Sequence, residues 1–154
     1  MNFSSPTKAT LNSSTLRVAL AIIYQEDRFL MQLRDDLPHI AFPGHWGLFG
    51  GHLESGETPE EGFKRELIEE INYQVPNPVL FRIQQEPEII RYFYHSPLTV
   101  PLEQLELQEG MDLGLVPLDA IEQGKYYSQK IQQVRPLGSV HRTILLDFFE
   151  SYLQ

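Results

Sequence analysis

The sequence predicts a single α/β domain in which a mixed β-sheet lies between helices. Short apolar or alternating stretches have the pattern of strands, and two longer stretches repeat apolar residues at helical spacing. The order of these stretches along the chain is strands, helix, strands, helix. A chain of 154 residues suits one such domain with a buried core. We expect the domain to span residues 15–154 and the polar residues 1–14 to form a disordered arm.

The first group of expected strands precedes the first helix. Thr15–Tyr24 is apolar and β-branched, which predicts a buried strand, and Phe29–Arg34 is its expected hairpin partner across a short polar turn. Prolines and a glycine punctuate Asp35–His45, so this stretch is expected to be a loop. Trp46–Glu54 predicts a short strand that glycines interrupt.

Both ends of the first helix, expected over Pro59–Ile71, carry clear signals. Thr58 is a favourable N-cap, and Glu61 three residues later completes a capping box. Asn72 tolerates the left-handed conformation that commonly ends a helix. The sequence therefore defines where this helix begins and ends.

The second half of the chain repeats the alternation of strands and helices. Val79–Gln85 and Ile89–Ser96 predict a second hairpin. Leu113–Pro117 predicts a further short strand, followed by a helical turn. Ser139–Leu153 is expected to be the last helix, because its apolar residues recur at helical spacing.

The composition limits the possible partners. The net charge of −9 makes general binding to a nucleic acid polymer or an anionic membrane unexpected. A phosphorylated small molecule remains possible if a cation bridges it to the protein. Without cysteine the chain forms no disulfide and no thiolate metal site, which fits a cytoplasmic location. It has no apolar stretch of about 20 residues to span a membrane.

Three glutamates, Glu66, Glu69 and Glu70, are neighbours on one side of the first helix. Like charges at this spacing destabilise a helix by about 0.2–0.5 kcal/mol per pair. A hard divalent cation, Mg²⁺ or Mn²⁺, would neutralise this repulsion. The alternative is a solvated acidic face that forms ion pairs with Lys64 and Arg65.

Further residues near the helix fit a cation site. Gly50 and Gly51 allow a loop to approach closely, so that a backbone carbonyl becomes an available ligand. Glu57 adds a fourth carboxylate just before the helix, and Arg65 is able to hold a carboxylate through two hydrogen bonds.

This stretch resembles the Nudix box, G-x5-E-x7-R-E-U-x-E-E-x-G-U, in which U is a bulky apolar residue. Tyr73 stands at the last bulky position, and Asn72 replaces the last glycine of the pattern. Asparagine is the next most tolerant residue for a left-handed cap, so we expect the geometry to be kept. The matches in register are Gly51, Glu57, Arg65, Glu66, Leu67, Glu69 and Glu70.

The resemblance implies an α/β/α sandwich around a mixed sheet. It also implies hydrolysis of a diphosphate linkage in a nucleoside diphosphate joined to another group, with Mg²⁺ or Mn²⁺ as cofactor. Glu66, Glu69 and Glu70 would then be metal ligands, with the Gly51 carbonyl as an extra one. Arg65 would orient the glutamates, and Glu57 would support the box or bind through water.

The remaining roles have open alternatives. The general base lies in the box or on a later loop, where Glu106 and Glu109 are candidates for it or else solvated charges. Arg34 either holds a phosphate or pairs with a neighbouring aspartate. Phe93 either lines a base pocket or packs in the core, as aromatic strand residues commonly do.

A small chain of this kind favours a (deoxy)nucleoside triphosphate as substrate, as in enzymes of the MutT kind. The alternative is an ADP-ribose or nucleotide-sugar pyrophosphatase. A non-catalytic nucleotide-binding module is a third possibility, but such modules often lose glutamates of the box, and this chain keeps them. The expected partner is therefore a small nucleotide, and the expected state is a monomer or homodimer.

Overall fold

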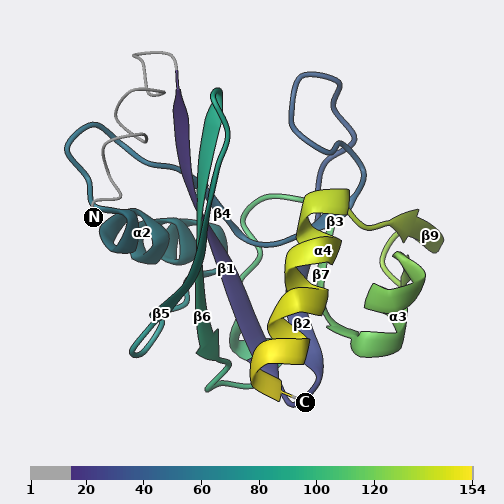
Figure 1. The fold of residues 1–154 in the computed structure, drawn as a ribbon. Coiled ribbons are helices and arrows are strands. Elements are labelled where there is room, and N and C mark those ends of the chain that lie inside the picture. The colour runs from purple at the N-terminus through teal and green to yellow at the C-terminus, as the bar shows by residue number, and fades with distance from the viewer. Residues whose placement is uncertain (1–14, 154) are drawn as a thin grey trace.

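The computed structural model describes residues 15–153, so the arm expected at residues 1–14 lies outside the described part. A seven-stranded mixed sheet separates helix α2 from helix α4, and a two-stranded sheet lies beside it (Figure 1). In chain order the elements are β1 (Leu16–Gln25), β2 (Arg28–Leu33), β3 (Trp46–Gly47), β4 (Gly50–His52), α2 (Pro59–Ile71), β5 (Val79–Gln85), β6 (Ile89–Pro97), the 3₁₀ turn η1 (Leu102–Gln104), β7 (Asp112–Pro117), α3 (Leu118–Gln123), β8 (Lys125–Ser128), β9 (Gln133–Pro136), α4 (Ser139–Phe148) and the π-helical turn η2 (Phe149–Leu153).

Strand β1 is the centre of the large sheet. It runs parallel to β6 and antiparallel to both β2 and β4. The hairpin expected between the first two strands forms, with Tyr24 opposite Phe29. The second expected hairpin forms between β5 and β6. The prediction of a mixed sheet is therefore confirmed.

The two faces of β1 belong to two separate cores. Val18, Leu20 and Ile22 pack with α4 in one cluster. Ala19, Ala21 and Ile23 pack with α2 in the other. Because the strand is buried on both faces, it has the nearly continuous apolar sequence from which it was predicted.

Helix α2 begins and ends where the sequence predicts. The Thr58 hydroxyl accepts a hydrogen bond from the Glu61 amide at 3.2 Å, and the Glu61 carboxylate accepts one from the Thr58 amide at 2.9 Å. Asn72 follows the helix with φ 54° and ψ 42°, in the left-handed region, and its amide donates to the Ile68 carbonyl. These caps fix the turn of helix that carries the glutamates.

Three features differ from the prediction. The stretch Trp46–Glu54 forms two strands rather than one, because β3 pairs with β2 whereas β4 pairs with β1. The hairpin of β8 and β9 was not expected. Its carbonyl at Tyr126 accepts a hydrogen bond from the Trp46 indole at 3.0 Å. The last helix ends at Phe148 and continues as the π-helical turn.

Within residues 15–153, every helix is too short or too polar to cross a bilayer.

Candidate active site

The candidate site lies where the polar side of α2 meets β4. Gly50 has φ +138°, and a Cβ there would collide with the Ala19 carbonyl. At Gly51 a Cβ would collide with the carboxylate of Glu66. Gly50 therefore allows β4 to lie close to the backbone of β1, and Gly51 allows it to lie close to the Glu66 carboxylate of the helix.

Arg65 connects the helix to the segment that precedes it. Its guanidinium donates to both carboxylate oxygens of Glu57, at 2.7 and 3.0 Å, and to the His52 carbonyl at 3.1 Å. A further contact reaches Glu69 at 3.2 Å. The hydrogen bonds from Arg65 lower the pKa of the Glu57 carboxyl to about 2. Glu57 therefore carries a full negative charge at neutral pH and locks Arg65 in place.

Glu70 and Glu66 are the two more buried carboxylates. Glu70 Oε1 accepts a hydrogen bond from the Gly50 amide at 2.9 Å. Burial raises the pKa of Glu70 to about 8, although the Gly50 hydrogen bond opposes the shift. Burial also raises the pKa of Glu66, and nearby Arg65 opposes that shift. Removal from water makes the charged form of each carboxylate costly in the absence of a cation.

The loop between η1 and β7 is tied to the end of α2. The Glu106 amide donates to the Ile71 carbonyl at 3.1 Å, and the Gln108 amide donates to the Glu70 carbonyl at 2.9 Å. Glu109 is exposed, and its charge contributes to the raised pKa values of both Glu66 and Glu70. Of the two loop candidates for a general base, Glu109 thus raises the pKa values of the glutamates through its charge. The contact that Glu106 makes with α2 is through its backbone amide.

The donor types of this site fit a hard cation, because they are carboxylate and carbonyl oxygens. Among residues 15–153, however, no three acidic, histidine or cysteine side chains converge in the geometry of a metal site. The carboxylate of Glu69 is turned towards Arg65, and that of Glu70 is bonded to the Gly50 amide. Binding of a cation by all three glutamates therefore requires Glu69 to leave Arg65.

Arg34 and Phe93, the two candidates for substrate binding, have different surroundings. Arg34 donates through Nε to the Ala41 carbonyl at 2.6 Å, and no described acid lies within ion-pair distance of it. Asp36, one of its expected partners, pairs instead with Arg135 at 3.1 Å. Phe93 is 0% exposed and packs on the α4 side of the sheet. Its assignment to a base pocket is corrected, because strand alternation turns its ring into the core.

His141 is a buried residue near the site, and its hydrogen-bonding role was not predicted from the sequence. Its Nδ1 accepts a hydrogen bond from the Leu48 amide at 3.1 Å. Burial lowers the pKa of His141 to about 3, and the charge of Arg34 adds to the shift. Leu48 lies between β3 and β4, so the imidazole holds the segment that leads to Gly50 and Gly51. Only its position on the apolar side of the last helix hinted at burial.

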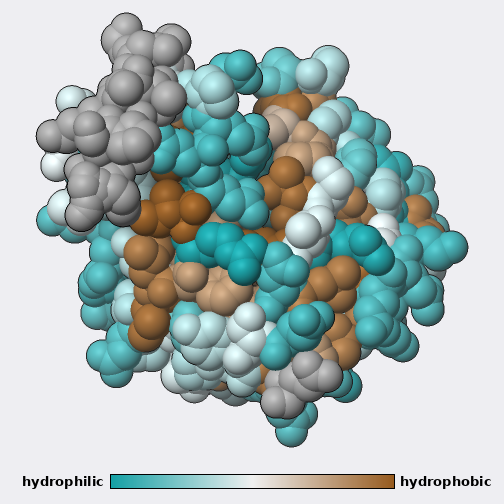
Figure 2. All heavy atoms as spheres, in the orientation of Figure 1, coloured by the Kyte–Doolittle hydropathy of each residue, from teal (hydrophilic) through white to brown (hydrophobic). Residues whose placement is uncertain are grey.

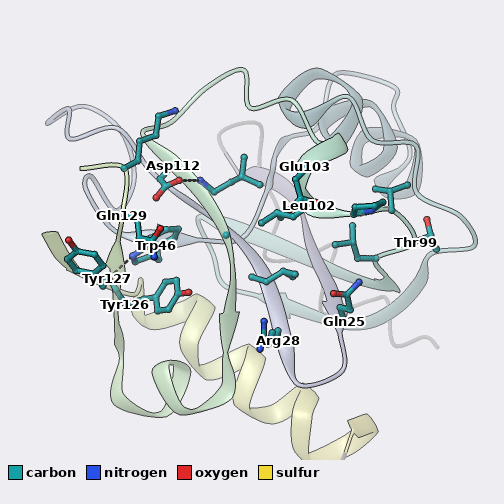
Figure 3. A pocket seen from close by; sticks show the side chains of 17 residues that line it. Gln25, Arg28, Trp46, Thr99, Leu102, Glu103, Asp112, Tyr126, Tyr127 and Gln129 are labelled. Carbon is teal, nitrogen blue, oxygen red and sulfur yellow. Dashed lines mark hydrogen bonds between the residues drawn. The ribbon is translucent and has the colours of Figure 1, made fainter. Parts of the chain in front are cut away.

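A cavity of about 1160 Å³ lies elsewhere, beside β7. Tyr126 and Tyr127 face it from one side and Leu102 and Glu103 from the other, with Arg28 towards one end (Figure 3). None of the glutamates of the box lines this cavity.

Comparison with known proteins gives three findings. The family model of the NUDIX domain matches residues 14–137. Nucleoside triphosphatase NudI of Escherichia coli O139:H28 is 53% identical over 34 residues, which cover 22% of this chain and 24% of that relative. NudI of Enterobacter sp. strain 638 is 57% identical over 30 residues, which cover 20% of this chain and 21% of that relative. The match thus spans about a quarter or less of these relatives' length.

Two solved structures resemble the fold over most of their length. MutT NUDIX hydrolase from Burkholderia pseudomallei has a TM-score of 0.66 at 20% identity, covering 86% of this chain and 96% of that one. MutT protein from Methanosarcina mazei Go1 also has a TM-score of 0.66 at 20% identity, covering 93% and 99%. At these identities the likeness concerns the fold.

Proposed function

This chain belongs to the Nudix family of hydrolases of phosphoric anhydrides, and we propose that it cleaves a diphosphate linkage in a nucleoside diphosphate derivative with a divalent cation as cofactor. The favoured substrate is a (deoxy)nucleoside triphosphate. The name of the relatives with the short match, nucleoside triphosphatase, supports this choice. An ADP-ribose or nucleotide-sugar substrate is the alternative.

One observation carries the proposal. Glu66 and Glu70 are withdrawn from water beside Gly50 and Gly51, where a bound cation would offset the cost of their charge. Glu66, Glu69, Glu70 and the Gly51 carbonyl would hold Mg²⁺ or Mn²⁺. When bound, the cation neutralises charge on nonbridging phosphate oxygens and makes a water molecule nucleophilic.

The other side chains have roles that follow from their contacts. Arg65 fixes Glu57 just before α2 and contacts Glu69, which has to leave Arg65 to bind the cation. Glu109 takes the proton of the attacking water as general base, because it lies on a loop that is tied to the helix carrying the glutamates. Arg34 binds a phosphate through Nη1 and Nη2, which make no hydrogen bond to a described residue.

The test is a screen of nucleoside triphosphates, ADP-ribose and nucleotide sugars, each with Mg²⁺ and with Mn²⁺. Products are identified by mass. The favoured substrate gives a nucleoside monophosphate and pyrophosphate, whereas ADP-ribose gives AMP and ribose 5-phosphate. If the folded protein hydrolyses neither class with either metal, the proposal is wrong.

A further inference from the structure

Strand β5 is an open edge of the seven-stranded sheet. Among the described residues it pairs with β6 alone. Three of its apolar side chains are largely exposed, Val79 by 51%, Leu80 by 42% and Ile83 by 46%. Figure 2 shows apolar side chains at the surface in the region that β5 occupies in Figure 1. Exposed apolar edge strands are ready to pair with another chain.

The position of α2 explains this exposure. The helix packs against β4, β1 and β6, and β5 lies beyond them at the sheet edge. The opposite edge, at β7, is better protected. There the Leu113 amide donates to the carboxylate of Asp112 at 2.8 Å. Side chains of β8 and of the turn after it line the cavity beside β7.

A β-bulge gives β5 an unusual pattern of faces. Leu80 lies opposite Tyr94, and Ile83 lies opposite Tyr92, with the register shift between Leu80 and Arg82. Tyr94 stacks on Phe63 of α2, with ring centroids 5.1 Å apart, and Tyr92 packs in the same cluster. Opposite residues of an antiparallel pair share a face. Leu80 and Ile83 therefore both lie on the α2 side, although they are three residues apart.

Charge does not oppose self-association at this edge. Arg82 is the one charged residue of β5, and it pairs with Asp147 of α4 at 2.7 Å. The strand carries no acid, whereas the whole chain has a net charge of −9. Two copies are thus able to approach through β5 with less repulsion than through an acidic surface.

We propose that β5 is the interface of a homodimer. The β5 strands of two copies pair antiparallel about a two-fold axis that passes between Phe81 and Arg82. This register places Leu80 of each copy opposite Ile83 of the other, so that the same apolar pair forms twice on the α2 side. The bulge makes this pairing possible, because it brings Leu80 and Ile83 to the same face of the sheet. In a regular strand, residues three apart lie on opposite faces and could not face each other across the two-fold axis. In such a two-fold interface each copy uses the same residues, so the partner that fits this strand is a second copy of the chain.

Sedimentation equilibrium of the full chain tests the proposal. The wild type is expected to form a concentration-dependent dimer. Leu80→Lys/Ile83→Lys places like charges opposite each other twice and abolishes the dimer. Leu80→Glu/Ile83→Lys places opposite charges in the same register and restores it. Ile83→Lys alone raises the dissociation constant by about tenfold, because it removes both apolar pairs.

The matched control is Val134→Lys. Val134 lies on β9 and is 57% exposed, so the substitution adds the same charge at an equally open apolar site without affecting dimerisation. All variants should keep the circular dichroism spectrum of the wild type. They should also keep its hydrolase activity, because β5 carries none of the residues of the candidate active site.

A second measurement uses the absence of cysteine from the chain. Leu80→Cys/Ile83→Cys is expected to form covalent dimers under mild oxidation, since cross-strand pairs bring Cβ atoms to about 4.5–5.5 Å. Each single cysteine variant should form far fewer. A monomeric wild type at all concentrations overturns the proposal. So does a double-lysine variant that dimerises normally, or cross-linking as strong in the single variants as in the double one. These outcomes do not depend on which substrate the enzyme cleaves.

Discussion

The imidazole of His141 on α4 accepts a hydrogen bond from the Leu48 amide, which lies 93 residues earlier in the chain. The contact ties the last helix to the backbone that leads into Gly50 and Gly51. Because Nδ1 is the acceptor, the ring has to be neutral and to carry its proton on Nε2. Protonation of Nδ1 would remove the acceptor from a buried site.

The first prediction follows from this neutrality. The folded pKa of His141 is about 3, against 6.5 for the unfolded chain. Below pH 6.5 the unfolded state therefore binds a proton that the folded state does not. The contribution of this group to the free energy of unfolding falls by about 1.4 kcal/mol per pH unit from pH 6.5 towards 3.

Urea denaturation at pH 7, 6, 5 and 4 measures this slope as a difference between wild type and His141→Asn. A difference is needed because Glu70, with a pKa of about 8, contributes the opposite slope in both proteins. The stability gap between them should narrow as the pH falls. His39→Asn, at an exposed position, should leave the slope unchanged. A gap that is constant with pH would contradict the neutral acceptor.

The second prediction concerns the carboxylates of α2. Glu69→Gln and Glu70→Gln should each lower turnover by more than the roughly 10- to 100-fold loss that follows removal of an outer-shell partner in metal sites. The fold should be kept, because Glu69 is exposed and the amide oxygen of a glutamine at position 70 is still able to accept from the Gly50 amide. Kinetics at limiting Mg²⁺ measure the loss.

Glu60→Gln is the control for this pair of variants. Glu60 lies on the same helix but forms its ion pair with Lys64, at 3.2 Å. Its variant should have wild-type turnover. Wild-type turnover in either Glu69→Gln or Glu70→Gln would mean that the cation binds elsewhere.

The third prediction is that Mg²⁺ or Mn²⁺ stabilises the folded protein. A ligand that binds only the native state adds about 2.7 kcal/mol at a hundredfold excess over its dissociation constant. Thermal melts with and without each metal measure the effect, and Glu70→Gln should reduce it. A melting temperature that saturating metal leaves unchanged would argue against the site.

The fourth prediction concerns Asn72, whose φ of 54° is the left-handed conformation. Asn72→Gly should be neutral or slightly stabilising, with turnover retained. Asn72→Val should lower both stability and turnover, because a β-branched side chain is strained at positive φ. Melting curves and initial rates compare the two variants. An Asn72→Val protein equal to wild type in both would show that the cap does not position the last turn of α2.

The parts of the fold that local signals encode were predictable. The capping box of Thr58 and Glu61 requires only residues three apart, and both of its hydrogen bonds are present. Asn72 ends the helix for a reason that also lies in its own side chain. The strands of both hairpins adjoin in sequence, so apolar runs and turns were enough to find them.

Long-range contacts explain what was missed. The sequence of β8 and β9 has exposed Tyr127 and Val134 and no clear alternation. This hairpin gains a contact from Trp46, far away in the chain. The face on which Phe93 lies depends on how β6 pairs with β1 and β5, which aromatic content does not reveal. The acceptor role of His141 likewise depends on Leu48.

The loop before β7 has two segments that should tolerate length changes differently. The hydrogen bonds from the Glu106 and Gln108 amides to the end of α2 act as a fixed anchor. Before this anchor, Leu98 and Leu105 are buried and the Thr99 amide donates to the Tyr73 hydroxyl, but Glu103 and Gln104 are exposed. Residues inserted at Glu103 and Gln104 are therefore able to bulge outwards. The segment between Gln108 and the start of β7 is short, and hydrogen bonds of the Gln108 and Met111 amides hold both of its ends. Even one added residue there displaces Glu109. Linkers, labels or fused domains therefore belong at Glu103 and Gln104, whereas the length of the segment after Gln108 has to be kept.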